Sequence, residues 1–242
     1  MPKCAVFSII DEARPERLRD HFVLVIDVLR ATSVMVTALD NGAARVYPVE
    51  TVEQAFAKRE CHPGALLCGE RKAVKIEGFD LSNSPSEYTP QAVAGKELIM
   101  TTSNGTRAIL RAVQGGKTVG LACFRNALAA CRAAAASGLD VAILCAGTND
   151  KYSMDDVLCA GALVHRLCAL GDFELDDLAN HALTLYRLGK DDIKGALSQC
   201  LHVGRVIAAG FAADLDYCYA QDVVQTLPLW RDGAITALTE AK

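Results

Sequence analysis

Three carboxylates follow apolar runs of the sequence, where a buried charge needs a partner. Asp27 comes directly after the four apolar residues Val23–Ile26, Glu70 follows the run Ala65–Cys68, and Asp80 is a similar candidate farther along. A carboxylate in such a place is costly to bury unless it meets a cation. Hard oxygen ligands of this kind suit Mg²⁺, although ion pairs of Asp27 with Arg30 and of Glu70 with Arg71 are the competing explanation. We therefore expect Asp27, Glu70 and Asp80 to hold a metal, and the first two to act in catalysis.

An arginine follows closely on each of three apolar runs, at Arg30, Arg71 and Arg107. The guanidinium group presents a planar fork of donors that matches phosphate, carboxylate or sulfonate. An ordinary surface arginine is the other interpretation of each. Arg30 is the strongest candidate, because its loop is short and otherwise apolar, and we expect a catalytic role for it. Arg71 and Arg107 are expected to bind substrate.

Hydroxyl and amide side chains crowd two segments that precede predicted helices. Five of the six residues from 101 to 106 are Thr, Ser or Asn. The start of a helix offers free N–H groups and the positive end of the helix dipole, which together bind anions. The same residue types are preferred N-caps, which explains any one of them but not the whole run. The expected substrate-binding residues are Thr32, Ser33, Thr101, Thr102, Asn104, Gly105 and Thr106.

Two further candidates lie on predicted helices. Asp156 ends the segment "SMDD", which is typical of a capping box with acids in the first turn, although the same geometry could present a carboxylate to a metal. His202 and Arg205 are three residues apart and would share a helix face. A histidine there could be the general acid for a leaving alkoxide, and a solvated helix face is the alternative. We carry Asp156 as a metal ligand and His202 as a catalytic residue.

The elements that must position these residues form an alternating α/β pattern. Strands are predicted at Cys4–Ile10, Phe22–Val28, Ala44–Val49, Ala65–Cys68, Glu97–Thr102, Thr118–Cys123 and Val141–Cys145. Helices are predicted at about 31–40, 51–60, 106–113, 126–137 and 155–170. Continuous apolar runs such as Val23–Ile26 are expected of strands covered on both faces, which predicts a three-layer α/β/α sandwich with a mainly parallel or mixed sheet. In a parallel sheet the polar loops emerge at one edge and would build one site.

The last third of the chain changes character. Helical patterns at about 176–187, 191–200 and 202–209 precede a strand near Leu215–Tyr219 and a hairpin at Asp232-Gly233. No linker rich in Pro, Gly or Ser interrupts the chain, so residues 1–242 are predicted to be one domain. Two segments, beginning near residues 26 and 101, share the order of polar turn, helix, Gly, strand and helix. This order is compatible with an internal duplication, although any two βαβ units look alike.

The composition excludes several classes of protein. The 242 residues are 51% hydrophobic and 22% charged with a formal net charge of -4, which is typical of a globular chain without a basic stripe for nucleic acid. No apolar run approaches the ~18 residues that span a bilayer, and "MPKCAVFSII" lacks the layout of a signal peptide. The ten cysteines include no C-x-x-C pair and favour buried thiols in a reducing compartment. We therefore expect a cytoplasmic protein without a membrane partner.

Common phosphate-handling motifs are absent, including G-x-x-x-x-G-K-[ST], G-x-S-x-G and D-x-D-x-[TV]. The polar loops instead resemble those of the 2-phosphosulfolactate phosphatase family. The matching segments are "VIDVLRATS", "GERKAVKIEGFDLSNSP", "IMTTSNGTRA", "CAGTNDKYSMDDVLCAG" and, more loosely, "HVGR" with "QDVVQTLP". They follow the family's order over about residues 22–220. Lys72-Ala73 and Ser82 depart from glycines that are common in the family, which bears on loop shape and substrate choice.

The resemblance implies an α/β/α fold and the Mg²⁺-dependent hydrolysis of 2-phospho-3-sulfolactate to sulfolactate and phosphate, a step toward coenzyme M. By matching position it favours Asp27, Arg30, Thr32, Glu70, Arg71, Asp80, Asn83, Thr102, Asn104 and Asp156 as site residues. Asn83 is carried as a substrate-binding residue on this ground. A phosphatase for another small phosphorylated 2-hydroxy acid and a non-catalytic domain that binds organic anions are the alternatives. A largely apolar chain with an edge hairpin also suits a homodimer.

These observations lead to one mechanistic hypothesis. Carboxylates hold Mg²⁺ against a phosphate oxygen, while Arg30 and the loop from 101 to 106 cradle the rest of the phosphoryl group. Arg71 or Arg107 pairs with the sulfonate or carboxylate of the substrate, and His202 protonates the leaving oxygen. Direct attack by water and a covalent intermediate both remain open.

Overall fold

The computed structural model describes residues 1–238, so the last four residues of the predicted 1–242 unit lie outside the described residues. Its strands are β1 (Lys3–Phe7), β2 (His21–Ile26), β3 (Arg45–Pro48), β4 (Leu66–Arg71), β5 (Val74–Lys75), β6 (Glu97–Thr101), β7 (Thr118–Ala122), β8 (Asp140–Cys145), β9 (Glu174–Leu175), β10 (Pro228–Arg231) and β11 (Ala234–Ala237). Its α-helices are α1 (Pro15–Leu18), α2 (Ala31–Asp40), α3 (Val52–Cys61), α4 (Pro90–Val93), α5 (Gly105–Val113), α6 (Ala127–Ala136), α7 (Met154–Leu170), α8 (Asp177–Gly189), α9 (Ile193–Ala196), α10 (Leu201–Ala208) and α11 (Ala213–Tyr219). Short 3-10 helices are η1 (Ile10–Glu12), η2 (Pro85–Glu87) and η3 (Phe124–Asn126).

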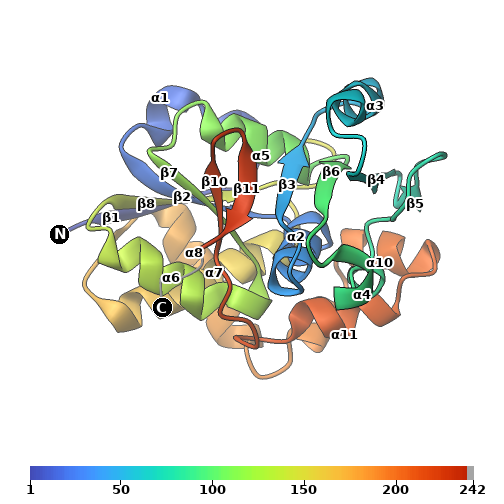
Figure 1. Ribbon diagram of the computed structural model, residues 1–242. Coiled ribbons are helices and arrows are strands. Elements are labelled where there is room, and N and C mark those ends of the chain that lie inside the picture. The colour runs from blue at the N-terminus through green and yellow to red at the C-terminus, as the bar shows by residue number, and fades with distance from the viewer. Residues whose placement is uncertain (239–242) are drawn as a thin grey trace.

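The strands form one mixed sheet of eleven strands in the order β5-β4-β6-β3-β11-β10-β7-β2-β8-β1-β9. Two parallel blocks, β4-β6-β3 and β7-β2-β8-β1-β9, run in opposite directions. The antiparallel hairpin β10–β11 lies between them and pairs with β7 on one side and β3 on the other. Figure 1 shows this red hairpin in the middle of the molecule. The last strands of the chain therefore join the two blocks into one sheet.

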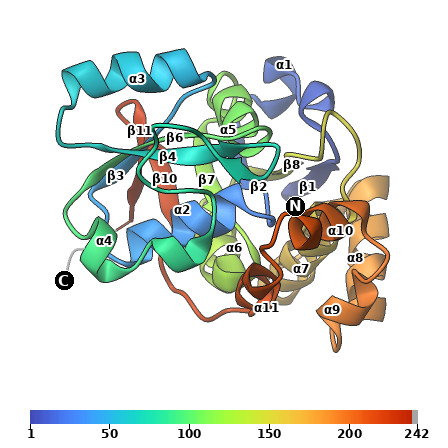
Figure 2. The same ribbon diagram turned by 90° about the vertical axis from the view of Figure 1, so that its right-hand side faces the viewer.

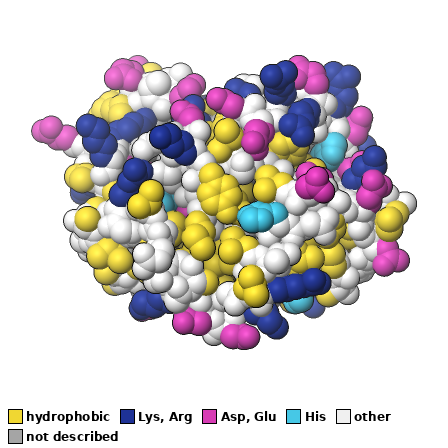
Figure 3. Space-filling model, turned by 180° about the vertical axis from the view of Figure 1, so that it is seen from behind, with side chains coloured by type: hydrophobic (Ala, Val, Ile, Leu, Met, Phe, Trp, Pro, Cys, Tyr) yellow, Lys and Arg dark blue, Asp and Glu magenta, His cyan; other side chains and the backbone are white. Residues whose placement is uncertain are grey.

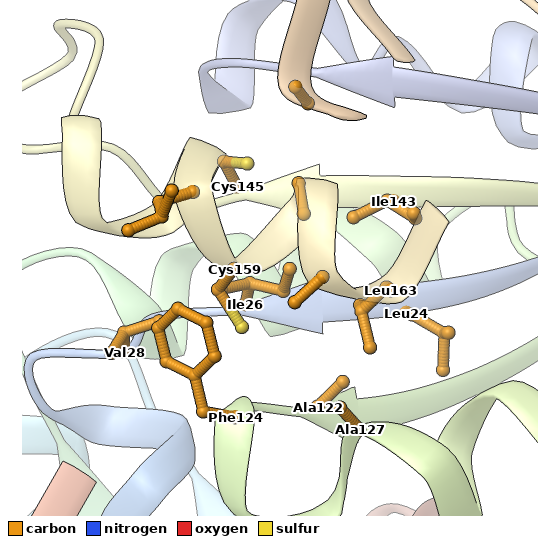
Figure 4. Close-up of a cluster of buried hydrophobic side chains, with 14 of the residues drawn as sticks. Leu24, Ile26, Val28, Ala122, Phe124, Ala127, Ile143, Cys145, Cys159 and Leu163 are labelled. Carbon is orange, nitrogen blue, oxygen red and sulfur yellow. The ribbon is translucent and has the colours of Figure 1, made fainter. Parts of the chain in front are cut away.

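Helices cover both faces of the sheet, which confirms the predicted α/β sandwich. Side chains alternate along β2: Val23 and Val25 pack in one cluster with α2 and α5, and Leu24 and Ile26 pack in another with α6 and α7. Figure 4 shows part of the second cluster, where Phe124 lies beside Ile26. Burying each such aliphatic side chain contributes roughly 1.5–3 kcal/mol. In the β3-β6-β4 block, α3 covers the outer face, and Figure 2 shows α3 above this block and α2 below it.

Two helices carry the chain from block to block over the same face of the sheet. Helix α2 leads from β2 to β3, and α5 leads back from β6 to β7. The expected single edge of a parallel sheet is not the arrangement found, because β4 and β6 run opposite to β2 and β8. The five steps from β2 to β6 accumulate a twist of roughly 100–125°, which turns the two sets of carboxyl ends toward each other. The polar loops still meet, because the twist of the sheet brings them together in place of a shared strand direction.

Most predicted elements are confirmed, and one is wrong. All seven predicted strands, the helices and the hairpin at Asp232-Gly233 are present, although the helix predicted at 191–200 is only the short α9. The segment predicted as a strand at Leu215–Tyr219 is helix α11 instead. Its buried residues Asp214, Leu215, Cys218 and Tyr219 recur at helical spacing, so the helix has one buried stripe. The two segments with the same element order become the α2 and α5 crossovers, and this likeness does not establish a duplication.

Three further findings concern membrane spans, cysteines and the surface of the molecule. Across residues 1–238, no helix combines the length and apolarity needed to cross a membrane. All ten cysteines are free thiols, and eight of them are buried. On the face seen in Figure 3, basic and acidic side chains are interspersed along the upper rim, while apolar side chains gather across the middle. The absence of a nucleic-acid partner stays an expectation.

Candidate active site

A cavity of about 550 Å³ lies where the loops after β2, β4, β6 and β8 meet α10. In Figure 1 its walls are on the right, where the β4–β5 hairpin lies above α10. Six of the predicted site residues line it: Asp27, Arg30, Glu70, Asn83, Asn104 and His202. The structure thus brings the four predicted catalytic residues into one cavity.

Asp27 begins the loop after β2 and is 6% exposed. Its Oδ1 accepts a hydrogen bond of 3.2 Å from the N–H of Ala31, at the start of α2. A Cβ atom at Gly105 would lie 2.5 Å from Asp27 Oδ2, so glycine is what allows the start of α5 to close on this carboxylate. Burial raises the pKa of Asp27 to about 6; the charges of Asp155 and Glu70 act in the same direction, whereas His202 and the Ala31 N–H oppose them.

Glu70 ties the β4–β5 hairpin to the loop after β6. Its Oε1 accepts from the N–H of Ser103 at 2.8 Å, and its Oε2 accepts from the N–H of Ala73 at 2.8 Å. Lys72 and Ala73 form the two-residue turn of the hairpin with φ values of 54° and 65°, which glycine and asparagine favour. Such a turn persists where its surroundings hold it. Here the carboxylate of Glu70 accepts from the N–H of Ala73, and Arg30 donates to the carbonyl of Ala73 at 3.4 Å.

Arg30 is 2% exposed, and its charge is already paired inside the protein. Its Nη1 donates to Asp214 Oδ2 at 2.6 Å, and the hydroxyl of Ser84 donates to the other oxygen of Asp214 at 2.7 Å. The ring of Phe211 lies 3.9 Å from the guanidinium carbon. Removing one partner of a buried pair typically costs about 3–5 kcal/mol. Arg30 therefore fixes the loop after β2 against α11 and brings little net charge to the cavity.

His202 on α10 is oriented by Asp155, from the first turn of α7. Its Nδ1 lies 3.1 Å from Asp155 Oδ2, and the hydroxyl of Ser153 donates to the other oxygen of Asp155. Burial alone lowers the pKa of His202, but the hydrogen bond and charge of Asp155, together with Asp27, outweigh it and raise the pKa above its ordinary value. With Nδ1 held by a carboxylate, Nε2 is the nitrogen that can exchange a proton with a ligand.

Asp156 is 3% exposed, and both of its oxygens are taken by backbone donors. Oδ1 accepts from the N–H of Val28 and Oδ2 from the N–H of Gly147, each at 2.9 Å. Burial raises its pKa well above the ordinary value, and the charges of Asp155 and Asp27 add to this. Asp156 does not line the cavity. Its bonds tie the end of β2 to the end of β8.

Several predicted hydroxyl residues brace the loops and do not line the cavity. Thr32 Oγ1 donates to the carbonyl of Asp27 at 2.9 Å and accepts from the N–H of Asp27 at 3.0 Å. Thr106 Oγ1 makes the same two bonds with Thr102, each at 3.1 Å. The hydroxyl of Ser33 likewise donates to a carbonyl of the loop after β2. These bonds match the capping interpretation more closely than phosphate binding.

The two arginines expected to bind substrate also bond elsewhere. Arg71 Nη2 donates to the carbonyl of Glu50 at 3.0 Å and to the hydroxyl of Thr101 at 2.8 Å. Arg107 forms an ion pair of 3.0 Å with Asp150 near the surface. Neither arginine lines the cavity. The part of the site that would neutralise a second anionic group must therefore come from other side chains.

The donor set of the cavity can be compared with what Mg²⁺ requires. Among residues 1–238, no three His, Cys, Asp or Glu side chains are grouped to hold a metal ion. Asp80 is exposed, 3.5 Å from Arg59, and outside the cavity. Asn83 Oδ1, by contrast, is buried, lacks a hydrogen-bond partner within the described residues and belongs to a residue that lines the cavity. Mg²⁺ is usually held by one or two carboxylates with waters and substrate phosphate, so Asp27, Glu70 and Asn83 fit it.

The cavity also contains residues for which the sequence predicts no role. Its further lining residues are Leu29, Lys72, Ala73, Val74, Ser103, Thr148, Asn149, Arg205, Val206, Ala208 and Ala209. Asp155 and Asp214 act behind this lining, on His202 and Arg30. The local signals for these residues are the polar run from 101 to 106, the departure at Lys72-Ala73, and the spacing of His202 and Arg205 on one helix. The pairing partners are 47 and 184 residues apart, which no local pattern reveals.

Comparison with known proteins covers nearly the whole chain. The family model described as 2-phosphosulpholactate phosphatase matches residues 7–233. A "Probable 2-phosphosulfolactate phosphatase" of Caldanaerobacter subterraneus subsp. tengcongensis is 43% identical over 220 residues, 90% of this chain and 91% of its own length. Proteins of the same name are 45% identical over 215 residues in Deinococcus radiodurans (88% of this chain, 89% of that one) and 41% identical over 227 residues in Clostridium acetobutylicum (93% and 96%). The matched region includes every residue that lines the cavity.

Proposed function

The chain belongs to the 2-phosphosulfolactate phosphatase family and is a phosphoric monoester hydrolase, and we propose that it releases phosphate from 2-phospho-3-sulfolactate with the help of Mg²⁺. The observation that supports this most is the content of the cavity. Oxygen ligands from Asp27, Glu70 and Asn83 line the same space as a histidine held by a buried carboxylate. Phosphoryl transfer needs charge neutralisation and a proton for the leaving oxygen, and these groups can supply both.

In this proposal Asp27, Glu70 and Asn83 hold the metal. Bound Mg²⁺ would withdraw charge from a phosphate oxygen and orient the ester. The hydrogen bonds of Glu70 to Ser103 and Ala73 keep its carboxylate in place while the ligand binds. The unpartnered Asn83 Oδ1 gains the electropositive neighbour that it lacks within the protein.

His202 donates the proton to the leaving alkoxide through Nε2. Asp155 keeps the imidazole in the protonated form, because it raises the pKa of His202. Asp27 must be ionised to bind a cation, and burial raises its pKa to about 6. Activity is therefore expected to rise as Asp27 loses its proton and to fall at higher pH as His202 loses its own.

The test is phosphate release from purified protein, with and without Mg²⁺, and after Asp27→Asn. We expect EDTA and the substitution each to remove most of the activity. Asp80→Asn is the matched control, since this carboxylate lies outside the cavity, and it should leave the rate unchanged. Activity that survives both EDTA and Asp27→Asn would contradict the metal assignment.

A phosphatase for another phosphorylated 2-hydroxy acid is the second candidate, and the hairpin turn favours it. Lys72 and Ala73 replace glycines that are common in the family, and both line the cavity. Substrate choice is therefore the part of the function that this chain is most able to alter. Assays of phospholactate, phosphoglycerate and phosphosulfolactate side by side would separate the two candidates by their kcat/KM.

We also propose a cellular setting. Ten free thiols suit the cytoplasm, where they stay reduced. The resemblance supports a role for the reaction on the route to coenzyme M. Exposed apolar side chains such as Leu188 and Leu201 suit a homodimer, which light scattering would test; a monomer at micromolar concentration would contradict it.

A further inference from the structure

Two cations on different elements line the cavity, and neither has an ion-pair partner among residues 1–238. Lys72 lies in the turn of the β4–β5 hairpin, and Arg205 lies on α10, one helical turn after His202. Within residues 1–238 neither side chain forms an ion pair, and both are exposed. Arg30 is the other arginine of the cavity, and Asp214 neutralises it. Lys72 and Arg205 therefore carry the unbalanced positive charge at the mouth of the site.

We propose that Lys72 and Arg205 together bind the second anionic group of the substrate, the carboxylate or sulfonate beside the phosphate ester. This inference rests on the proposed function, because it assigns residues to the part of the substrate that is not hydrolysed. Asp27, Glu70 and Asn83 line the same cavity, and in the proposed function their oxygen atoms serve the phosphoryl end of the substrate. The two cations then select phosphoesters that carry another negative charge close by.

The hairpin makes Lys72 a fixed part of the site. The N–H of Ala73, the next residue, donates to Glu70, and its carbonyl accepts from Arg30. The turn is held with two positive φ values at residues that are not glycine. Backbone strain of this kind persists where the surroundings hold it, and it is common at ligand-binding sites. The position of Lys72 is thereby coupled to the residues at the phosphoryl end.

Arg205 is coupled to the same end through α10. Arg205 and His202 are three residues apart on this helix, and both line the cavity. Arg205 also lines the neighbouring smaller cavity with Thr148 and Lys151, and no acidic side chain lines that space. Its guanidinium fork matches the planar carboxylate geometry better than an ammonium group does.

The decisive experiment compares three phosphoesters with the wild type and with a Lys72→Gln/Arg205→Gln double variant. Phosphosulfolactate and phospholactate carry a second anion, and isopropyl phosphate carries none. A charge-assisted contact contributes enough that the double variant should lose about 10- to 100-fold in kcat/KM on the first two esters, mainly through KM. On isopropyl phosphate it should change less than about threefold, because that ester makes no such contact.

Arg45→Gln is the matched control, because Arg45 is paired with Glu97 outside the cavity. It should behave as wild type on all three esters. Equal losses of the double variant on all three esters, or no loss on any, would overturn the subsite. If the wild type hydrolyses none of them, the proposed function fails and the subsite is judged by calorimetry with sulfolactate. Binding by wild type that the double variant loses supports it, and equal or absent binding overturns it.

Discussion

The loops after β2 and β6 are built on one plan and do different work. Each precedes a helix that crosses the same face of the sheet, and each is braced by a threonine near the start of that helix. Thr32 bonds to both backbone groups of Asp27, and Thr106 bonds to both backbone groups of Thr102. The braced residue is a buried acid in the cavity in the first loop, but a buried hydroxyl outside the cavity in the second.

The difference shows how chemistry is placed on a shared support. The hydroxyl brace fixes the backbone and leaves the side chain of the braced residue to do other work. In the loop after β6 the Thr102 hydroxyl accepts from the N–H of Thr106, so it completes the helix start. In the loop after β2 the Asp27 carboxylate accepts from Ala31 and lies against Gly105, the first residue of the other helix. Gly105 at the start of α5 thus leaves the space that the carboxylate of Asp27, from the loop before α2, occupies.

The largest effect should come from Asp27→Asn, and the isosteric change of the other braced residue, Thr102→Val, is its matched comparison. Asp27→Asn removes the charge proposed to hold the metal, and kcat/KM should fall on the order of 10³-fold, as for other preorganised electrostatic groups. Thr102→Val removes a hydroxyl outside the cavity and should change kcat/KM less than about tenfold. Phosphate release measured with saturating Mg²⁺ checks both. Comparable losses in the two variants would show that the loops share the chemistry.

The same Asp27→Asn variant should be more stable than wild type at neutral pH. The pKa of Asp27 is raised to about 6 in the folded protein, so the folded state binds the proton more tightly than the unfolded state. The free energy of unfolding therefore falls as pH rises from about 4 to 6, by roughly 1–3 kcal/mol. Asparagine abolishes this loss. Urea titrations of both proteins at pH 4.5 and 7.5, without metal, should show the gap widening at the higher pH; a constant gap would contradict it.

The next effect sharpens the role of the histidine that faces Asp27. Asp155→Asn removes the charge that raises the pKa of His202, so the alkaline limb of kcat/KM should move to lower pH. At pH 8 the rate should fall by up to about 100-fold, the lower end of the usual contribution of general acid catalysis. Asp177→Asn, an acid in the first turn of the neighbouring helix α8, is the control. If the rate falls but the alkaline limb of kcat/KM stays at the same pH, the role of Asp155 is structural only.

The sequence was informative about elements and much less so about partners. Apolar runs predict the strands of both blocks, and the residues at their ends include Asp27 and Arg30 after β2 and Glu70 near the end of β4. The opposite directions of the blocks were not predictable, because they depend on a C-terminal hairpin that inserts between β7 and β3. The strand predicted at Leu215–Tyr219 is helix α11 in the structure, because five residues are too few to separate the strand period from the helix period.

The structure gives several predicted site residues an internal partner that no local pattern shows. Arg71 and Asp156 bond to backbone and hydroxyl groups and do not line the cavity, whereas Glu70 bonds to backbone groups and does line it. Asp155 resembled an ordinary first-turn acid until α10 placed His202 beside it. Composition and spacing report what a side chain can do, whereas the partner it meets is decided by tertiary packing.

A smaller effect tests the contact between the two helix starts. In Gly105→Ala the new Cβ would lie 2.5 Å from both Ala31 Cβ and Asp27 Oδ2, so the carboxylate must shift. Overpacking of this kind typically costs about 1–3 kcal/mol. The displaced carboxylate should also lower kcat/KM by about tenfold, since small misplacements at a reacting centre are costly. Gly64→Ala, where nothing lies within 4 Å of the new atom, should change neither quantity.

The smallest effect concerns the braces themselves, where the two loops should behave alike. Thr32→Val and Thr106→Val each remove a buried hydroxyl that donates to a carbonyl and accepts from an N–H. Leaving those backbone groups without a partner should lower the free energy of unfolding by about 1–3 kcal/mol in either variant. Because Thr32 braces the acid of the cavity, its loss should also reduce the apparent affinity for Mg²⁺, whereas Thr106→Val should not. Chemical denaturation would measure the stabilities, and titration with Mg²⁺ would measure the metal affinities. Equal metal affinities in the two variants would contradict a role of Thr32 in positioning Asp27 for the metal.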